Sequence, residues 1–275
     1  MKANRCINAT VALLALTAMF TSNGARGQQP STPAQAAPST ETAAPLVEPD
    51  AVAVLNKMGA YMRTLNAFSV RSETTIDEVT DDGMKLQFGG TVTMQVKRPN
   101  GFHAELSSDR KERQLFYDGK TVTLYGKRIG YYATAPAPAT LRELGEVLDR
   151  KYGIRLALND LFYWGTDESV AANIKEAAII GPSRCGDAVC DHVAVRQEGV
   201  DWQVWIERGK SPLPRKLVIT TTSEPSQPQY VATMQWNTAP KFEAATFRFS
   251  PPMGAHRIPL LDANAASAGR QKGLP

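Results

Sequence analysis

Two neighbouring segments, residues 68–79 and 84–97, alternate between apolar and polar side chains, and Asp82-Gly83 between them is typical of a β-hairpin turn. The pattern predicts two paired strands of about 12 and 14 residues, well beyond the usual five or six. Strands of this length must coil, and Gly89-Gly90 inside the second is a place where a sheet can bend or bulge. The chain therefore favours a curved antiparallel sheet with one apolar face.

The rest of the chain continues this pattern, with helices before and between the strands. Strands follow Arg98-Pro99-Asn100-Gly101 and flank Asp118-Gly119, and five more are expected between residues 177 and 237, with a short last one around 247–249. A first helix begins at Pro49, and Thr140 with Glu143 forms a capping box for a later helix. The fold class is α+β, a curved antiparallel sheet forming an unclosed β-barrel with helices covering its concave face.

The two ends of the chain have compositions unlike the middle. Residues 1–27 combine a short basic start, an apolar run and small residues near Ala25, which predicts a cleavable export signal and a periplasmic location. Residues 28–47 are rich in Pro, Ala, Ser, Thr and Gln and are expected to be a disordered linker, and residues 259–275 a disordered tail. Residues 48–258 are then a single folded domain.

Loss of the signal changes the charge of the protein. The signal carries Lys2, Arg5 and Arg26 and no acid, so the mature chain would keep 28 basic residues against 27 acidic ones. A chain that is close to neutral lacks the basic surface typical of nucleic-acid-binding proteins. We therefore expect no nucleic-acid partner, and at most a peripheral or transient contact with a membrane.

Residues with catalytic chemistry do not form a motif. The three histidines, His103, His192 and His256, lie in separate segments, and no metal-ligand spacing or nucleophile motif is present. We expect a protein that is not an enzyme and has no metal or cofactor. Cys185 and Cys190 enclose four residues between two predicted strands, which favours a structural disulfide over a catalytic dithiol.

Apolar side chains on the concave face and on the inserted helices are the candidate ligand contacts. A curved sheet can leave a volume that its side chains do not fill, and an apolar lining with few polar groups suits acyl chains. The candidate lining residues are Phe68, Val70, Phe88, Val92, Met94, Phe102, Leu106, Leu115, Tyr117, Leu144, Leu148, Phe162 and Trp164.

Several motifs of this chain resemble those of a known superfamily. The run from Val96 to Glu105 and the hairpin from Phe116 to Tyr125 are similar to segments of the outer-membrane lipoprotein carriers of the Gram-negative periplasm. A closer resemblance, carried by residues 190–197, 200–206 and 212–220, is to an uncharacterised family of predicted periplasmic proteins in the same superfamily.

The resemblance implies an unclosed barrel that encloses an apolar cavity, and a carrier or sensor of lipids or acylated lipoproteins. Arg71 is a candidate for the functional arginine of the carriers. We expect a monomer that binds lipid or acylated lipoprotein, with an envelope protein as a possible further partner. The alternative function is a protein-binding envelope scaffold with a packed, ligand-free barrel, in which residues 28–45 present a short binding motif.

Overall fold

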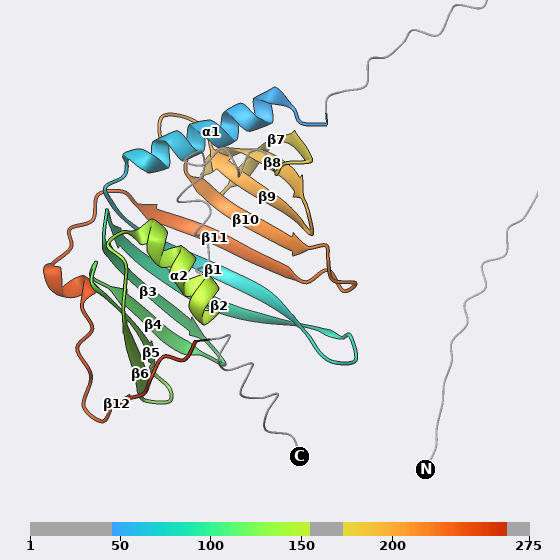
Figure 1. Ribbon diagram of the computed structural model, residues 1–275. Coiled ribbons are helices and arrows are strands. Elements are labelled where there is room, and N and C mark those ends of the chain that lie inside the picture. The colour runs from blue at the N-terminus through green and yellow to red at the C-terminus, as the bar shows by residue number, and fades with distance from the viewer. Residues whose placement is uncertain (1–45, 155–172, 263–275) are drawn as a thin grey trace, which may run out of the picture. The chain divides into compact units, whose positions relative to one another are not determined.

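A single sheet of twelve strands organises the protein, which we describe from a computed structural model for residues 46–154 and 173–262. The strand order is β12-β6-β5-β4-β3-β2-β1-β11-β10-β9-β8-β7. Every neighbouring pair is antiparallel except β12 and β6, which are parallel. The first and last strands of this order are not paired, so the sheet does not close into a barrel (Figure 1).

The strands fall into two sets, which meet where β1 pairs with β11. The first set is β1 (Ala67–Val79), β2 (Lys85–Lys97), β3 (Gly101–Ser108), β4 (Glu112–Tyr117), β5 (Thr121–Gly126) and β6 (Tyr131–Pro136). The second set is β7 (Glu176–Cys185), β8 (Ala188–Gln197), β9 (Val200–Glu207), β10 (Pro214–Thr221) and β11 (Gln229–Asn237), and the short β12 (His256–Arg257) then returns to β6. The predicted curved, unclosed antiparallel sheet is therefore confirmed, with one parallel strand added at its edge.

The two helices form where the sequence signals predicted them. Helix α1 (Pro49–Thr64) has Pro49 in its first turn, and α2 (Leu141–Tyr152) begins after Thr140, whose side chain accepts a hydrogen bond from the Glu143 backbone N–H at 3.3 Å. Figure 1 shows α1 running beside β7 to β10 and α2 in front of β1 to β3. Within the described ranges, no helix is long and apolar enough to cross a membrane.

The hydrophobic core lies between these helices and the concave face of the sheet. Leu55, Met58 and Met62 of α1 and Leu144 and Leu148 of α2 are buried in one cluster with strand residues from β1 to β11. On β1, side chains from Phe68 to Thr74 alternate between buried and outward-facing, as the sequence predicted. The second apolar segment of the helical insertion, which includes Phe162 and Trp164, lies outside the described residues.

Two local predictions need correction. The β1–β2 pairing register runs unbroken through Gly89 and Gly90, and the β2–β3 register begins at Gly90, so these glycines form no bulge. A Cβ atom on Gly90 would lie 3.0 Å from the carbonyl oxygen of Ser107. Strand β3 therefore approaches Gly90 so closely that a larger side chain would crowd it. The register shifts instead occur in β7, between Ile179 and Gly181, and in β10.

The second correction concerns residues 247–249, where a strand was expected. Residues Ala244–Phe247 form a 3₁₀ helix, η1, and the chain then crosses the outer face of the sheet. The Phe249 ring lies 5.4 Å from Phe116, 5.3 Å from Tyr125 and 5.0 Å from Tyr132 between ring centroids. The alternating aromatic residues that suggested a strand therefore pack on the sheet from outside instead of pairing with its edge.

Candidate binding site

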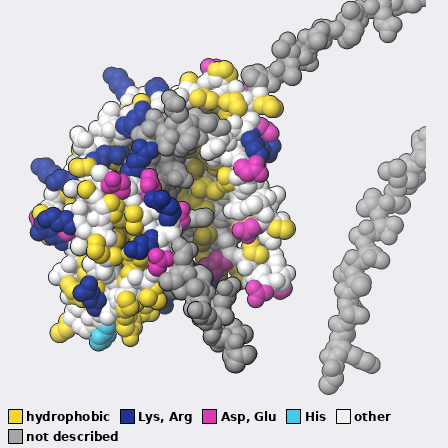
Figure 2. Space-filling model, viewed as in Figure 1, with side chains coloured by type: hydrophobic (Ala, Val, Ile, Leu, Met, Phe, Trp, Pro, Cys, Tyr) yellow, Lys and Arg dark blue, Asp and Glu magenta, His cyan; other side chains and the backbone are white. Residues whose placement is uncertain are grey.

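An apolar pocket of about 340 Å³ lies on the concave face, at the end of the sheet formed by the β1–β2 hairpin and strands β3 to β5. Figure 2 shows apolar side chains in the hollow of the bent sheet. The side chains that line the pocket from the sheet are mostly apolar, with a few charged groups at the rim. They include Thr74, Ile76, Phe88, Val92, Met94, Phe102, Ala104, Leu106, Leu115, Leu124 and Tyr230, together with Glu78, Arg110, Lys111 and Arg113.

Strand pairing brings the apolar lining together. Residues directly opposite in an antiparallel pair project from the same face, with Cβ atoms about 5 Å apart. Met94 of β2 lies opposite Ala104 of β3, Ala104 lies opposite Leu115 of β4, and Leu115 lies opposite Leu124 of β5. Four consecutive strands thus supply one continuous apolar row across the pocket floor.

The structure divides the predicted lining residues into three groups. Phe88, Val92, Met94, Phe102, Leu106 and Leu115 line the pocket, and four of them, Val92, Met94, Phe102 and Leu115, are at most 8% exposed and also belong to the core cluster. Phe68, Val70, Tyr117, Leu144 and Leu148 are in the packed core, and each is at most 1% exposed. Phe162 and Trp164 lie outside the described residues.

Tyr117 illustrates why part of the predicted set is core. Its side chain is fully buried, and its hydroxyl donates a hydrogen bond of 2.7 Å to the backbone carbonyl of Pro138, just before α2. Leu144 and Leu148 of α2 pack in the same cluster. The α2 helix therefore fills one end of the concave face and leaves the pocket at the other end.

Tyr230 is a lining residue that sequence reasoning missed. It faces Ile76 across the β1–β11 pair, and its buried hydroxyl has no hydrogen-bond partner in the described part of the chain. Burial raises the pKa of Tyr230 to about 12, so the group stays protonated and is a potential donor. No local pattern marks Tyr230, because its position beside Ile76 depends on a pairing of strands about 150 residues apart in sequence. Ile76 and Leu124, by contrast, follow the alternation of their own strands.

Arg71 lies on the opposite face from the pocket. Its side chain is exposed, and its guanidinium is 3.1 Å from the carboxylate of Glu73 on the same strand. The arginines and lysine that line the pocket are Arg110, Lys111 and Arg113, around the β3–β4 turn.

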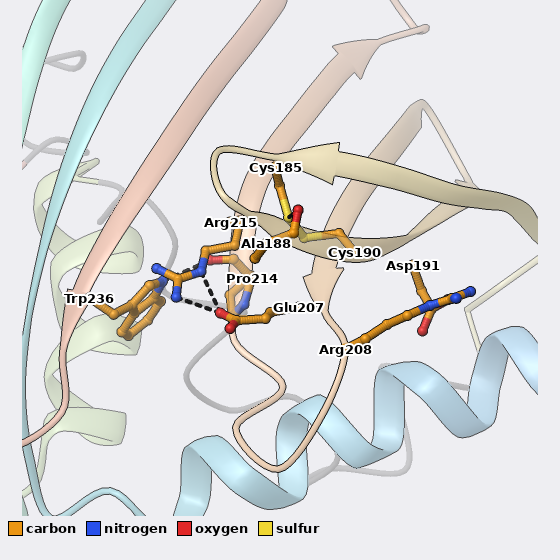
Figure 3. Close-up of a disulfide and its surroundings, with 9 residues drawn as sticks. All are labelled: Cys185, Ala188, Cys190, Asp191, Glu207, Arg208, Pro214, Arg215 and Trp236. Atoms are coloured by element: carbon orange, nitrogen blue, oxygen red, sulfur yellow. Dashed lines mark hydrogen bonds and ion pairs between the residues drawn. A yellow bond between two sulfur atoms is a disulfide. The ribbon is translucent and has the colours of Figure 1, made fainter.

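The predicted disulfide is present between Cys185 and Cys190, whose Cα atoms are 6.1 Å apart. It closes the β7–β8 hairpin at the far edge of the sheet (Figure 3). Nearby, the Arg215 Nε donates a 2.7 Å hydrogen bond to Glu207, and Trp236 donates to the Pro214 carbonyl at 2.7 Å. The β7–β8 hairpin itself lies at the edge of the strand order that is farther from the pocket strands.

The histidines lie on separate elements, and each has a ring contact with an aromatic residue; the His256 ring lies 5.8 Å from that of Tyr131 between ring centroids. The His103 ring stacks on Phe116 at 4.2 Å, and the His192 ring stacks on Trp205 at 4.0 Å, between ring centroids. Across the ranges 46–154 and 173–262, no group of three or more His, Cys, Asp or Glu side chains is arranged to hold a metal ion.

Comparisons with solved structures find similar folds at low sequence identity. MucB is 16% identical over 74% of this chain, with a TM-score of 0.42, and the similarity spans 64% of MucB, less than two thirds of its length. The Mycobacterium tuberculosis lipoprotein LppX is 12% identical over 71% of this chain and 100% of its own, with a TM-score of 0.44. A LolA superfamily protein from Nitrosomonas europaea is 9% identical over 72% of this chain and 97% of its own, with a TM-score of 0.35.

The family is shown by the sequence itself. No curated protein matches the sequence. Residues 51–261, which include all twelve strands, match the model of one family, described as "Predicted periplasmic protein (DUF2092)". The chain therefore belongs to the DUF2092 family of predicted periplasmic proteins.

Proposed function

We propose that this protein is a non-catalytic, periplasmic carrier or sensor of lipids, and that it holds acyl chains in the pocket on its concave face. The observation that carries the proposal is the continuous apolar row across β2 to β5, which lines a pocket among the described residues. The proposed ligand contacts are Phe88, Val92, Met94, Phe102, Leu106 and Leu115.

The chemistry of the lining supports a hydrocarbon ligand. Covering apolar surface is favourable by roughly 25 cal/mol for each Å² removed from water. Ile76 and Leu86, on the β1–β2 hairpin, are 47% and 38% exposed, and both lie on the face that carries the pocket. An acyl chain that covers these side chains would gain this free energy without requiring a polar partner for every atom.

Native mass spectrometry of protein purified without detergent, followed by lipid extraction, tests the proposal. We expect a population carrying an extra mass that extraction identifies as an acyl lipid. A protein that carries no lipid and also fails to bind any fluorescent fatty-acyl probe would contradict the proposal.

A pair of charge substitutions tests the location of the ligand. Leu106→Asp places a carboxylate in the pocket and should abolish probe binding. Ile129→Asp is the matched control, because Ile129 is 68% exposed and does not line the pocket. Circular dichroism and thermal unfolding of both variants establish that any loss of binding occurs in folded protein.

The rival function is a protein-binding envelope scaffold, and the tightly packed set of strands from β8 to β10 is the observation that favours it. Val193, Val204 and Leu217 on these strands are at most 4% exposed, and none of them lines the apolar pocket. Deleting residues 28–45 separates the two functions. The carrier should keep its lipid binding and its cellular function after the deletion, whereas the scaffold should lose function although a folded Leu106→Asp variant retains it.

A further inference from the structure

Positively charged side chains outnumber negatively charged ones at the pocket. Arg110, Lys111 and Arg113 line it from the β3–β4 turn and the start of β4, whereas the acids among its lining residues are Glu78 and Glu105. The Glu105 carboxylate accepts a 3.1 Å hydrogen bond from Gln114 and lies on the outer face of the sheet. Three cations therefore face the pocket against the single carboxylate of Glu78.

Two of these cations share that carboxylate. The Arg110 Nη1 lies 2.5 Å from Glu78 Oε2, and the Lys111 Nζ lies 3.7 Å from Glu78 Oε1. The Arg110 guanidinium also lies 4.6 Å above the centre of the Phe88 ring, so it is held directly over the apolar floor. One carboxylate neutralises one positive charge, which leaves this end of the pocket with a net positive charge.

Arg113 is the cation with no counter-charge. It lies opposite Leu106 on β3 and opposite Gly126 on β5, on the concave face, and its side chain is exposed. Within the part of the chain that the structure describes, its guanidinium has no ion pair or hydrogen bond. A guanidinium beside an apolar row can form two parallel hydrogen bonds with a carboxylate or phosphate.

We infer that the pocket selects ligands with a single acyl chain and an anionic head group, bound by Arg113 and Lys111. The inference rests on the proposed function, and it adds the class of ligand. The chain would lie along Val92, Leu106 and Met94, and the head group would remain at the rim. A volume of about 340 Å³ is at the lower end of the range for ligand pockets, about 300–1,000 Å³, which favours one chain over several.

Ligands that share one chain and differ only in the head group test this inference. The probes are dodecanoate, dodecanol and dodecyltrimethylammonium, with affinities measured by displacement of a fluorescent probe and by calorimetry. We expect dodecanoate to bind about tenfold more tightly than dodecanol, equivalent to about 1.4 kcal/mol, and the cationic probe to bind most weakly. Added salt should weaken the binding of dodecanoate and leave that of dodecanol unchanged.

Two substitutions with opposite expected effects on dodecanoate affinity identify the residues that bind the head group. Arg113→Gln should weaken dodecanoate binding about tenfold and leave dodecanol binding unchanged. Glu78→Gln should strengthen dodecanoate binding, because Arg110 and Lys111 lose their competing carboxylate. Arg71→Gln is the matched control, since Arg71 is an exposed arginine on the opposite face of the same sheet, and it should change neither affinity.

The outcomes separate this inference from the proposed function. If dodecanoate and dodecanol bind equally in the wild type, or if Arg113→Gln weakens both equally, the head-group selection is refuted and acyl binding stands. If none of the three probes binds, the proposed function itself fails. Selective weakening of dodecanoate by Arg113→Gln, absent in Arg71→Gln, supports the inference.

Discussion

The concave face has two regions with the same side-chain pattern, and they differ in whether exposed apolar side chains and a pocket lie beside the buried residues. In the packed region, formed by β8 to β10, the inward-facing residues Val193, Val204 and Leu217 are at most 4% exposed. In the open region, formed by the β1–β2 hairpin and β3 to β5, Ile76 is 47% exposed, and Leu106 is only partly buried. Directly opposed pairs connect the two regions through β1 and β11, so both belong to one face of one sheet.

The difference shows that alternation predicts which face of a strand is apolar and not what covers that face. Helix α1 contributes Leu55, Met58 and Met62 to the core, and α2 contributes Leu144 and Leu148. Side chains from the helices complete the core at one end of the strands. At the other end of the strands, apolar side chains on the same face of the sheet line the pocket.

The largest expected effect is on the stability of the packed region. Leu217→Ala removes a side chain that is 4% exposed and leaves a cavity, so the free energy of unfolding should fall by about 2–5 kcal/mol. Urea unfolding followed by circular dichroism measures this change. The affinity of the folded variant for a fatty-acyl probe should remain at the wild-type value, and a weaker affinity would show that the two regions are not independent.

The disulfide should contribute less, and only to the edge of the packed region. Replacing both Cys185 and Cys190 with alanine should lower the free energy of unfolding by about 2 kcal/mol, because the bond closes a very short loop. Acyl binding should be unaffected, since the hairpin is at the far end of the strand order from the pocket.

Thiol titration of denatured wild-type protein provides the corresponding control. After export and signal removal it should find no free thiol without reductant and two with reductant. Two free thiols in protein isolated from the periplasm would refute the bond.

In the open region a substitution should weaken acyl binding as well as lower stability. Leu106→Ala should lower the free energy of unfolding by only about 1 kcal/mol, because the side chain is partly exposed. It should nevertheless weaken acyl binding about fivefold, equivalent to about 1 kcal/mol. Parallel unfolding and binding measurements on Leu106→Ala and Leu217→Ala compare the regions directly, and equal effects on binding would contradict the distinction.

The smallest expected effect is on the pH dependence of stability, and it comes from His103 on the outer face of the sheet, behind the open region. Burial lowers the pKa of His103 below its ordinary value, although the nearby Glu105 carboxylate partly opposes the shift. As the pH falls below about 6.5, the ordinary histidine pKa, the unfolded chain binds the proton first and the folded protein loses stability. His103→Gln should therefore lose less stability than the wild type between pH of about 7.5 and about 5. An identical pH dependence for both proteins would contradict this assignment.

Local sequence signals predicted the secondary structure and the apolar face, whereas the membership of the pocket depends on how the strands pair. The turn residues, the capping box at Thr140 and the alternation on β1 predicted the strands, the helices and the apolar face, because these signals are local. Which inward-facing residues also line the pocket was not predictable, since Leu115 and Tyr117 have the same pattern on β4 and only Leu115 lines the pocket. The positions of Tyr230 and Arg113 at the pocket also depend on strand pairing, which no local signal encodes.

The central claim is that an acyl chain lies in the open region and not elsewhere on the sheet. The most direct measurement is crosslinking with a photoreactive fatty acid, followed by peptide mapping by mass spectrometry, on the full mature protein. We predict that the crosslinked peptides come from residues 74–126, which include Phe88, Val92 and Leu106, and that excess dodecanoate prevents the crosslinks. Crosslinks confined to β8 to β10 or to the outer face, or crosslinks that dodecanoate does not reduce, would contradict the account.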